Sequence, residues 1–130
     1  MAIASINPAT GETVATFEAH DDAEIERRIA QSRAAFEQLR GTTYAQRAQW
    51  MIAAADLMEA EVEEAAAMMT IEMGKTLAQA RAEVRKSANT MRFYAKHAEE
   101  YLTGRELDAA AVNASRAYQI FQPLGVVLAV

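Results

Sequence analysis

The alternation of apolar and polar positions predicts a short hairpin at the start of the chain. Residues 2–6 are mainly apolar, residues 7–12 ("NPATGE") are a dense group of turn formers, and residues 13–17 alternate and include β-branched side chains. This pattern is typical of two antiparallel strands joined by a tight turn.

Helical periodicity begins after the hairpin. Asp21 and Glu24 have the spacing of a capping box, and Gly41 is a suitable helix end. The apolar residues between them fall on one face at helical spacing. They are Ile25, Ile29, Phe36 and Leu39.

A second helix is predicted from Thr43, which forms a capping pattern with Gln46, through an Ala/Met-rich stretch to Gly74. The pattern within it weakens near residues 60–61, where we expect a break.

A third helix is predicted from Thr76, again three residues before a glutamine, to Gly104. One apolar stripe runs along its whole length. The stripe consists of Leu77, Ala80, Val84, Ala88, Met91, Ala95, Ala98 and Leu102.

The pattern changes to that of strands after Gly104. An Ala-rich stretch of ambiguous type is followed by an alternating segment at about 115–122, which predicts a strand, and then by a Pro/Gly bend. Residues 126–130 are apolar at every position, which is typical of a strand covered on both faces in a parallel sheet. Such a strand needs partners that this chain does not contain. The sequence therefore predicts a mostly helical chain of the α/β class with an unfinished sheet.

Composition narrows the function classes. The chain is 52% hydrophobic and 24% charged, as in ordinary globular proteins, and its net charge of −5 with interspersed basic residues argues against nucleic acid as a partner. The absence of cysteine excludes disulfides, thiolate metal ligands and a cysteine nucleophile in these 130 residues. With neither a signal-peptide pattern nor an apolar run of membrane length, we expect a cytoplasmic, soluble protein.

Local motifs alone indicate no reaction. "GKT" at 74–76 is not a phosphate-binding loop, because Met69 stands where that loop requires glycine. His20 and His97 have no second ligand at metal spacing. Lys86 has Asn89 and Phe93 at helical spacing, so it could face a polar cavity; an ordinary surface lysine is the favoured alternative.

Four segments in register resemble the NAD(P)-dependent aldehyde dehydrogenases over essentially the whole chain. They are "INPATGE" at 6–12, "EMGKT" at 72–76, "YAKHAEEYL" at 94–102 and "QPLGVVLAV" at 122–130. The longer segment "EMGKTLAQARAEVRKSAN" at 72–89 looks most like the succinate-semialdehyde dehydrogenase branch.

The resemblance implies a division of the chain. Residues 1–104 would be the N-terminal helical part of a cofactor-binding domain, 105–123 an oligomerisation arm, and 124–130 the truncated first strand of the dinucleotide-binding sheet; the catalytic domain is absent. It also implies NAD or NADP as cofactor, an aldehyde substrate such as succinic semialdehyde, and a homo-oligomer. Family chemistry uses a cysteine nucleophile, an oxyanion-binding asparagine and a glutamate base, none of which matches a residue here. We therefore expect these residues alone to be inactive.

Three sites carry over from the resemblance. Val130 aligns with the edge of the cofactor cleft, and Lys86 lies where the third helix lines the mouth of the substrate tunnel. In some family members the carbonyls matching Ser5 and Ile6 and the acid matching Glu72 hold a structural monovalent cation.

Two hypotheses about function follow. The first is that the chain is the N-terminal portion of an aldehyde dehydrogenase, truncated within an apolar strand that lacks a polar end. The second is a non-catalytic helical interaction module that pairs with another subunit.

Overall fold

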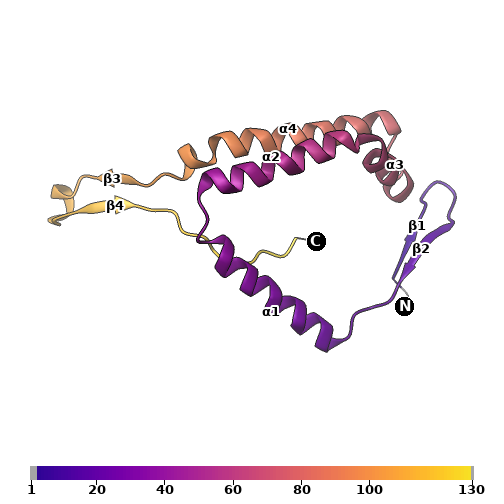
Figure 1. Cartoon of the computed structure of the whole chain (residues 1–130), viewed down its shortest axis with the longest axis horizontal. Helices are drawn as coiled ribbons and strands as arrows, with labels where there is room; N and C mark the ends of the chain where they lie inside the picture. Colours follow the sequence, from indigo (N-terminus) through magenta and orange to yellow (C-terminus); the bar gives the residue numbers. More distant parts are fainter. Residues whose placement is uncertain (1–2, 130) are drawn as a thin grey trace.

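The computed structural model describes residues 3–129, which form two short hairpins and four α-helices (Figure 1). The elements in chain order are β1 (Ile3–Ile6), β2 (Thr13–Phe17), α1 (Asp22–Leu39), α2 (Tyr44–Ala60), α3 (Val62–Met73), α4 (Leu77–Leu102), β3 (Arg105–Leu107), the 3-10 turn η1 (Ala110–Val112) and β4 (Ala117–Gln119). The long helices α2 and α4 lie side by side, and the two hairpins lie at opposite ends of this pair.

The N-terminal hairpin is confirmed. β1 and β2 pair antiparallel, with Ile3 opposite Phe17 and an irregularity of register between Ser5 and Ile6. In the turn, the Asn7 side chain accepts a hydrogen bond from the backbone N–H of Ala9 at 2.9 Å. This Asx turn is the reason why the "NPATGE" cluster reverses the chain.

Helix starts follow the predicted caps. Thr43 and Gln46 form a reciprocal capping box at α2, and the Thr76 hydroxyl accepts from the Gln79 N–H at 3.4 Å at α4. The expected break near 60–61 is also confirmed, because Glu61 leaves helical geometry (φ −103°, ψ 24°) and separates α2 from α3. The predicted second helix is therefore two helices.

The core is a narrow seam of small residues between α4 and the antiparallel α2 and α3. Its members are buried alanines and one valine: Ala55, Ala66, Ala80, Val84 and Ala88. The last three belong to the stripe predicted for the third helix, so that stripe is the packing face of α4. Small side chains allow the helix backbones to approach closely, but they bury little apolar area.

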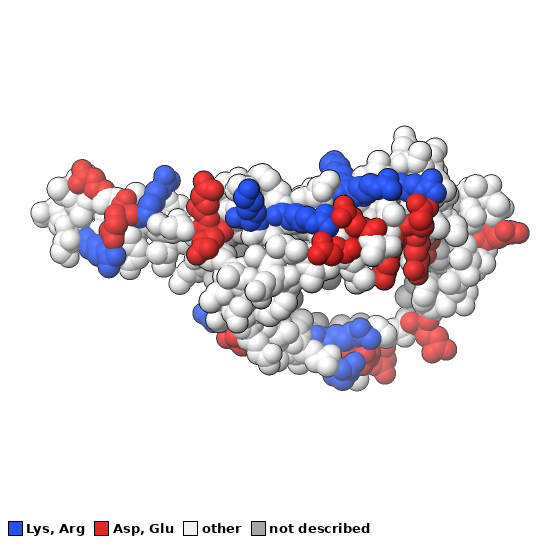
Figure 2. Space-filling view, turned by 45° about the horizontal axis from the view of Figure 1, so that its top comes forward, with Lys and Arg blue, Asp and Glu red and all other residues white. Residues whose placement is uncertain are grey.

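Ion pairs cross this seam at its exposed edge. Arg81 of α4 donates to Glu63 of α3 at 2.6 Å, and Arg92 of α4 donates to Asp56 and Glu59 of α2 at 2.6 and 2.7 Å. Figure 2 shows the acidic and basic side chains next to one another along the helices. Because these pairs are exposed, each adds little to stability.

Helix α1 stands apart from the α2–α4 pair (Figure 1). Its predicted apolar face exists but is largely exposed: the exposed fraction of Ile29 is 55%, and Phe36 is half-buried. Residues 124–128 run beside it and form an open groove with Ile29 and Phe36.

The C-terminal strands differ from the prediction. The strand expected over 115–122 is only Ala117–Gln119, and it pairs antiparallel with β3, which lies in the stretch after Gly104 that the sequence left undefined. The strand expected over 126–130 is not formed at 126–129, where the described chain offers no neighbouring strand to pair with; Val130 lies outside the described residues. A strand exists only through its ladder of hydrogen bonds. Leu124 and Leu128 are accordingly 100% and 86% exposed.

Within the described residues, no helix combines the length and the apolar character needed to cross a membrane.

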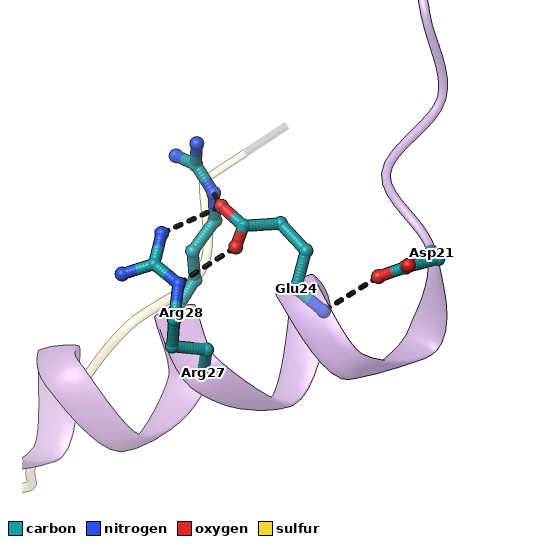
Figure 3. Close-up of polar contacts among 4 residues, drawn as sticks. All are labelled: Asp21, Glu24, Arg27 and Arg28. Atoms are coloured by element: carbon teal, nitrogen blue, oxygen red, sulfur yellow. Dashed lines mark hydrogen bonds and ion pairs between the residues drawn. The ribbon is translucent and has the colours of Figure 1, made fainter.

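The start of α1 is held by a local charged network (Figure 3). Asp21 accepts a hydrogen bond from the Glu24 N–H at 2.8 Å, which confirms the N-cap. The Glu24 carboxylate does not close the capping box; it accepts from Arg27 Nη2 at 2.6 Å and from Arg28 Nε at 2.8 Å. Hydrogen bonds from Arg27 and then Arg28 lower the pKa of Glu24 from 4.5 to about 2.

We predict that this network makes α1 sensitive to acid. A lowered folded-state pKa means that the ionised carboxylate stabilises the helix above the ordinary value of 4.5, and that this contribution is lost as the pH falls through about 2. A synthetic peptide of residues 18–42 should lose helical circular dichroism over that range. The Glu24→Gln peptide, which keeps every other acid, should lose clearly less; an identical loss in both peptides would contradict the role of Glu24.

Candidate functional site

The N-terminal hairpin and the end of α3 bring together two of the predicted site residues. The Ser5 hydroxyl in β1 donates a hydrogen bond to Glu72 Oε1 in the last turn of α3 at 2.8 Å, across 67 residues of sequence. Ser5 is half-buried and Glu72 is exposed. The sequence placed these residues in one site only through the family resemblance, and the structure makes them neighbours.

A second contact holds the same junction. Gly74 ends α3 in the left-handed conformation (φ 69°), and a Cβ at this position would lie 3.1 Å from Pro8 Cγ in the hairpin turn. The left-handed backbone conformation therefore favours glycine, and any larger residue would also meet Pro8 at close range. Gly74 and Thr76, the caps of α3 and α4, confirm that "GKT" is a helix-to-helix turn and not a phosphate loop.

The junction offers oxygen donors of the kind that hard cations take. They are the Ser5 hydroxyl and the Glu72 carboxylate; Ile6, the third predicted residue, follows Ser5 at the irregular position of β1. Among residues 3–129 no cluster of three or more His, Cys, Asp or Glu side chains could hold a metal ion.

The other predicted site is on the face of α4 that points away from its buried stripe. Lys86, Asn89 and Phe93 line one open depression of about 520 Å³, as their helical spacing predicted. The remaining lining residues come from the same helix: Ala82, Arg85, Thr90 and Tyr94. Polar and apolar side chains thus share one surface, a composition suited to a small amphipathic ligand.

Aromatic side chains continue this face toward the end of α4. The ring of Phe93 lies 4.7 Å from that of His97, which in turn stacks on Tyr101 at 5.8 Å between centroids. His97 is half-buried in this row, and its Nδ1 lies 3.5 Å from Glu100. This placement supports the non-catalytic interpretation of His97.

Sequence reasoning missed Arg85. Its neighbour Lys86 was selected because Asn89 and Phe93 follow it by three and seven residues and so lie on the same face of the helix. Arg85 points about 100° away from Lys86 around the helix axis, so this spacing did not include it. The structure shows that it borders the same depression from the other side. Val130, the predicted cofactor contact, lies outside the described residues.

The family model described as "Aldehyde dehydrogenase family" matches residues 1–130. This chain belongs to the aldehyde dehydrogenase family. The resemblance inferred from four short segments is thereby confirmed.

Curated aldehyde dehydrogenases support the same branch. The chain is 57% identical over 130 residues to "Succinate-semialdehyde dehydrogenase [NADP(+)] 1" of Mycobacterium tuberculosis, and 57% identical over 131 residues to "Succinate-semialdehyde dehydrogenase [NADP(+)]" of Mycobacterium avium. Each comparison covers 100% of this chain and 28% of the relative. The chain therefore spans a little more than a quarter of the length of these aldehyde dehydrogenases.

Solved structures show the same fold. A chain from the structural study of cofactor and substrate selection by Gox0499 superimposes with a TM-score of 0.87 at 29% identity, covering 95% of this chain and 27% of that one. An aldehyde dehydrogenase from Brucella melitensis biovar abortus 2308 gives a TM-score of 0.76 at 31% identity, with 84% and 22% covered. These matches confirm that the chain has the N-terminal architecture of an aldehyde dehydrogenase.

Proposed function

We propose that residues 1–130 are the N-terminal part of an enzyme that oxidises succinic semialdehyde to the carboxylic acid with NAD(P)+. The observation that carries this proposal is the sequence identity of 57%, in an alignment that covers 100% of the chain, to proteins named succinate-semialdehyde dehydrogenase. Those relatives carry NADP(+) in their names, so NADP+ is the favoured cofactor.

The chemistry of the proposed reaction assigns these residues a supporting role. Oxidation of an aldehyde in this family passes through attack by a cysteine thiolate, and the chain contains no cysteine. The thiolate, the oxyanion donors and the water-activating base would therefore come from outside residues 1–130. We expect no aldehyde oxidation from the 130-residue chain alone.

The remaining site assignments are part of the same proposal. Lys86 would stand at the substrate entrance, Val130 would contact the dinucleotide, and Ser5, Ile6 and Glu72 would surround a structural monovalent cation. Support for the cation comes from the Ser5–Glu72 contact at 2.8 Å.

Oligomerisation is proposed through the projecting β3–β4 hairpin. The hairpin lies far from the α2–α4 seam (Figure 1), and Leu107, Val112 and Tyr118 are all more than half exposed. An exposed two-stranded ribbon has free edges that another subunit can pair with. A homo-oligomer in the cytoplasm remains our prediction for the complete enzyme.

A chimera tests the proposed function. We predict that residues 1–130 joined to the rest of the M. tuberculosis relative will reduce NADP+ with succinic semialdehyde at a kcat/KM within about tenfold of the parent enzyme, because core positions at 57% identity tolerate volume-conserving exchange. The 130-residue chain alone serves as the inactive control. A folded chimera that oxidises no aldehyde would contradict the proposal and favour the alternative, a non-catalytic interaction module that pairs with another subunit.

Replacing Lys86 tests the substrate entrance. In the chimera, Lys86→Met should raise KM for succinic semialdehyde about tenfold, since a charge-assisted hydrogen bond to the distal carboxylate contributes about 1.5 kcal/mol. KM for butanal, which lacks that carboxylate, should change less than about twofold. Lys96→Met on the same helix, outside the depression, is the matched control. Equal effects on the two aldehydes would rule out the role of Lys86.

A further inference from the structure

The depression on α4 is bordered by two cations. Arg85 and Lys86 both line it, and neither makes a side-chain hydrogen bond or ion pair with any of residues 3–129. The other basic residues facing the seam are neutralised: Arg81 by Glu63, and Arg92 by Asp56 and Glu59. Two basic side chains without a hydrogen bond or ion pair thus lie next to each other on α4. The hydrogen bond from Arg81 and, more weakly, the charge of Arg85 lower the pKa of Glu63, so Arg85 also lies within reach of the Glu63 charge.

The two cations stand on opposite sides of a common floor. At 100° per residue, Ala82, Asn89 and Phe93 fall between the directions of Arg85 and Lys86. All five residues line the same depression. A carboxylate lying on this floor can therefore be reached from both sides, by the planar guanidinium fork of Arg85 and by the point charge of Lys86.

The floor itself is suited to a short carbon chain. Ala82 and the exposed ring of Phe93 provide apolar surface, and the Asn89 amide provides a neutral donor. The Thr90 hydroxyl is already engaged, because it donates to the Lys86 carbonyl at 2.9 Å. The surface thus combines two positively charged side chains, which can bind a carboxylate, with apolar contacts for a few methylene groups.

We propose that Arg85 is a second specificity-determining residue, which together with Lys86 holds the distal carboxylate of the aldehyde substrate. This inference rests on the proposed function and deepens it: the preferred substrates are aldehydes with a carboxylate at the far end of a short chain. Arg85 touches the part of the substrate that does not react, so its loss should affect binding and not turnover.

Kinetics of chimera variants test the two-cation anchor. Arg85→Gln should raise KM for succinic semialdehyde five- to tenfold with kcat within about twofold, and should leave KM for butanal unchanged. The conservative Arg85→Lys should recover part of the loss. Lys96→Gln, also on α4 but outside the depression, should change neither substrate.

A double-mutant cycle asks whether the two cations hold the same group. If Arg85 and Lys86 bind one carboxylate, Arg85→Gln combined with Lys86→Met should raise KM by less than the product of the single effects. Independent effects that multiply fully, or an Arg85→Gln variant with an unchanged KM ratio between the two aldehydes, would overturn the shared anchor.

Binding of succinate keeps this test separate from the proposed function. The dissociation constant of succinate, measured calorimetrically on the chimera, should rise at least fivefold in Arg85→Gln and not change in Lys96→Gln. A chimera that binds succinate in this way but oxidises no aldehyde would contradict the proposed function and support the anchor. Succinate binding that is identical in Arg85→Gln and in the unmodified chimera would overturn the anchor even if succinic semialdehyde is oxidised.

Discussion

The close antiparallel contact of α4 with α2 and α3 is the constraint on which the rest of this structure depends. It is possible because the facing positions are alanines, with Val84 as the largest fully buried side chain. Where interiors pack this closely, an added methylene is typically opposed by about 1–3 kcal/mol of strain. The contact sets the rotation of α4 about its axis, and that rotation sends Arg85, Lys86 and Phe93 to the outer face. The helix register thus determines which residues are available to a ligand.

The same seam explains how the N-terminal hairpin is positioned. α3 ends at Gly74, where glycine accepts a left-handed backbone at little cost and Pro8 of the hairpin turn lies close by. This places the last turn of α3 against β1, where Glu72 meets Ser5. Two residues that are 67 positions apart in the sequence therefore meet where α3 ends.

Local chemistry made much of the architecture predictable from the sequence. Thr43, Thr76 and Gly74 mark helix limits through hydrogen bonds and backbone conformations that involve only neighbouring residues, and all three were identified correctly. Strand formation was less predictable, because a strand depends on a partner elsewhere in the chain. Residues 126–129 have a strand-like composition but form no strand. β3, in contrast, is a strand of three residues whose composition does not indicate one. The site followed the same rule. Lys86, Asn89 and Phe93 could be grouped by helical spacing. The Ser5–Glu72 contact joins residues 67 positions apart, so only the family resemblance could group them. Arg85 points about 100° away from Lys86 around the helix, so the same spacing did not select it.

This chain has the architecture of an aldehyde dehydrogenase N-terminus, and we infer that residues 3–129 bury too little apolar surface to fold stably alone. The α1 face and residues 124–128 remain largely exposed, and among residues 3–129 the buried hydrophobic core consists of five small residues. Sedimentation velocity of the purified 130-residue chain, with a thermal scan of the same sample, tests this most directly. We predict concentration-dependent self-association and no sharp unfolding transition. A monomer that unfolds cooperatively would contradict it.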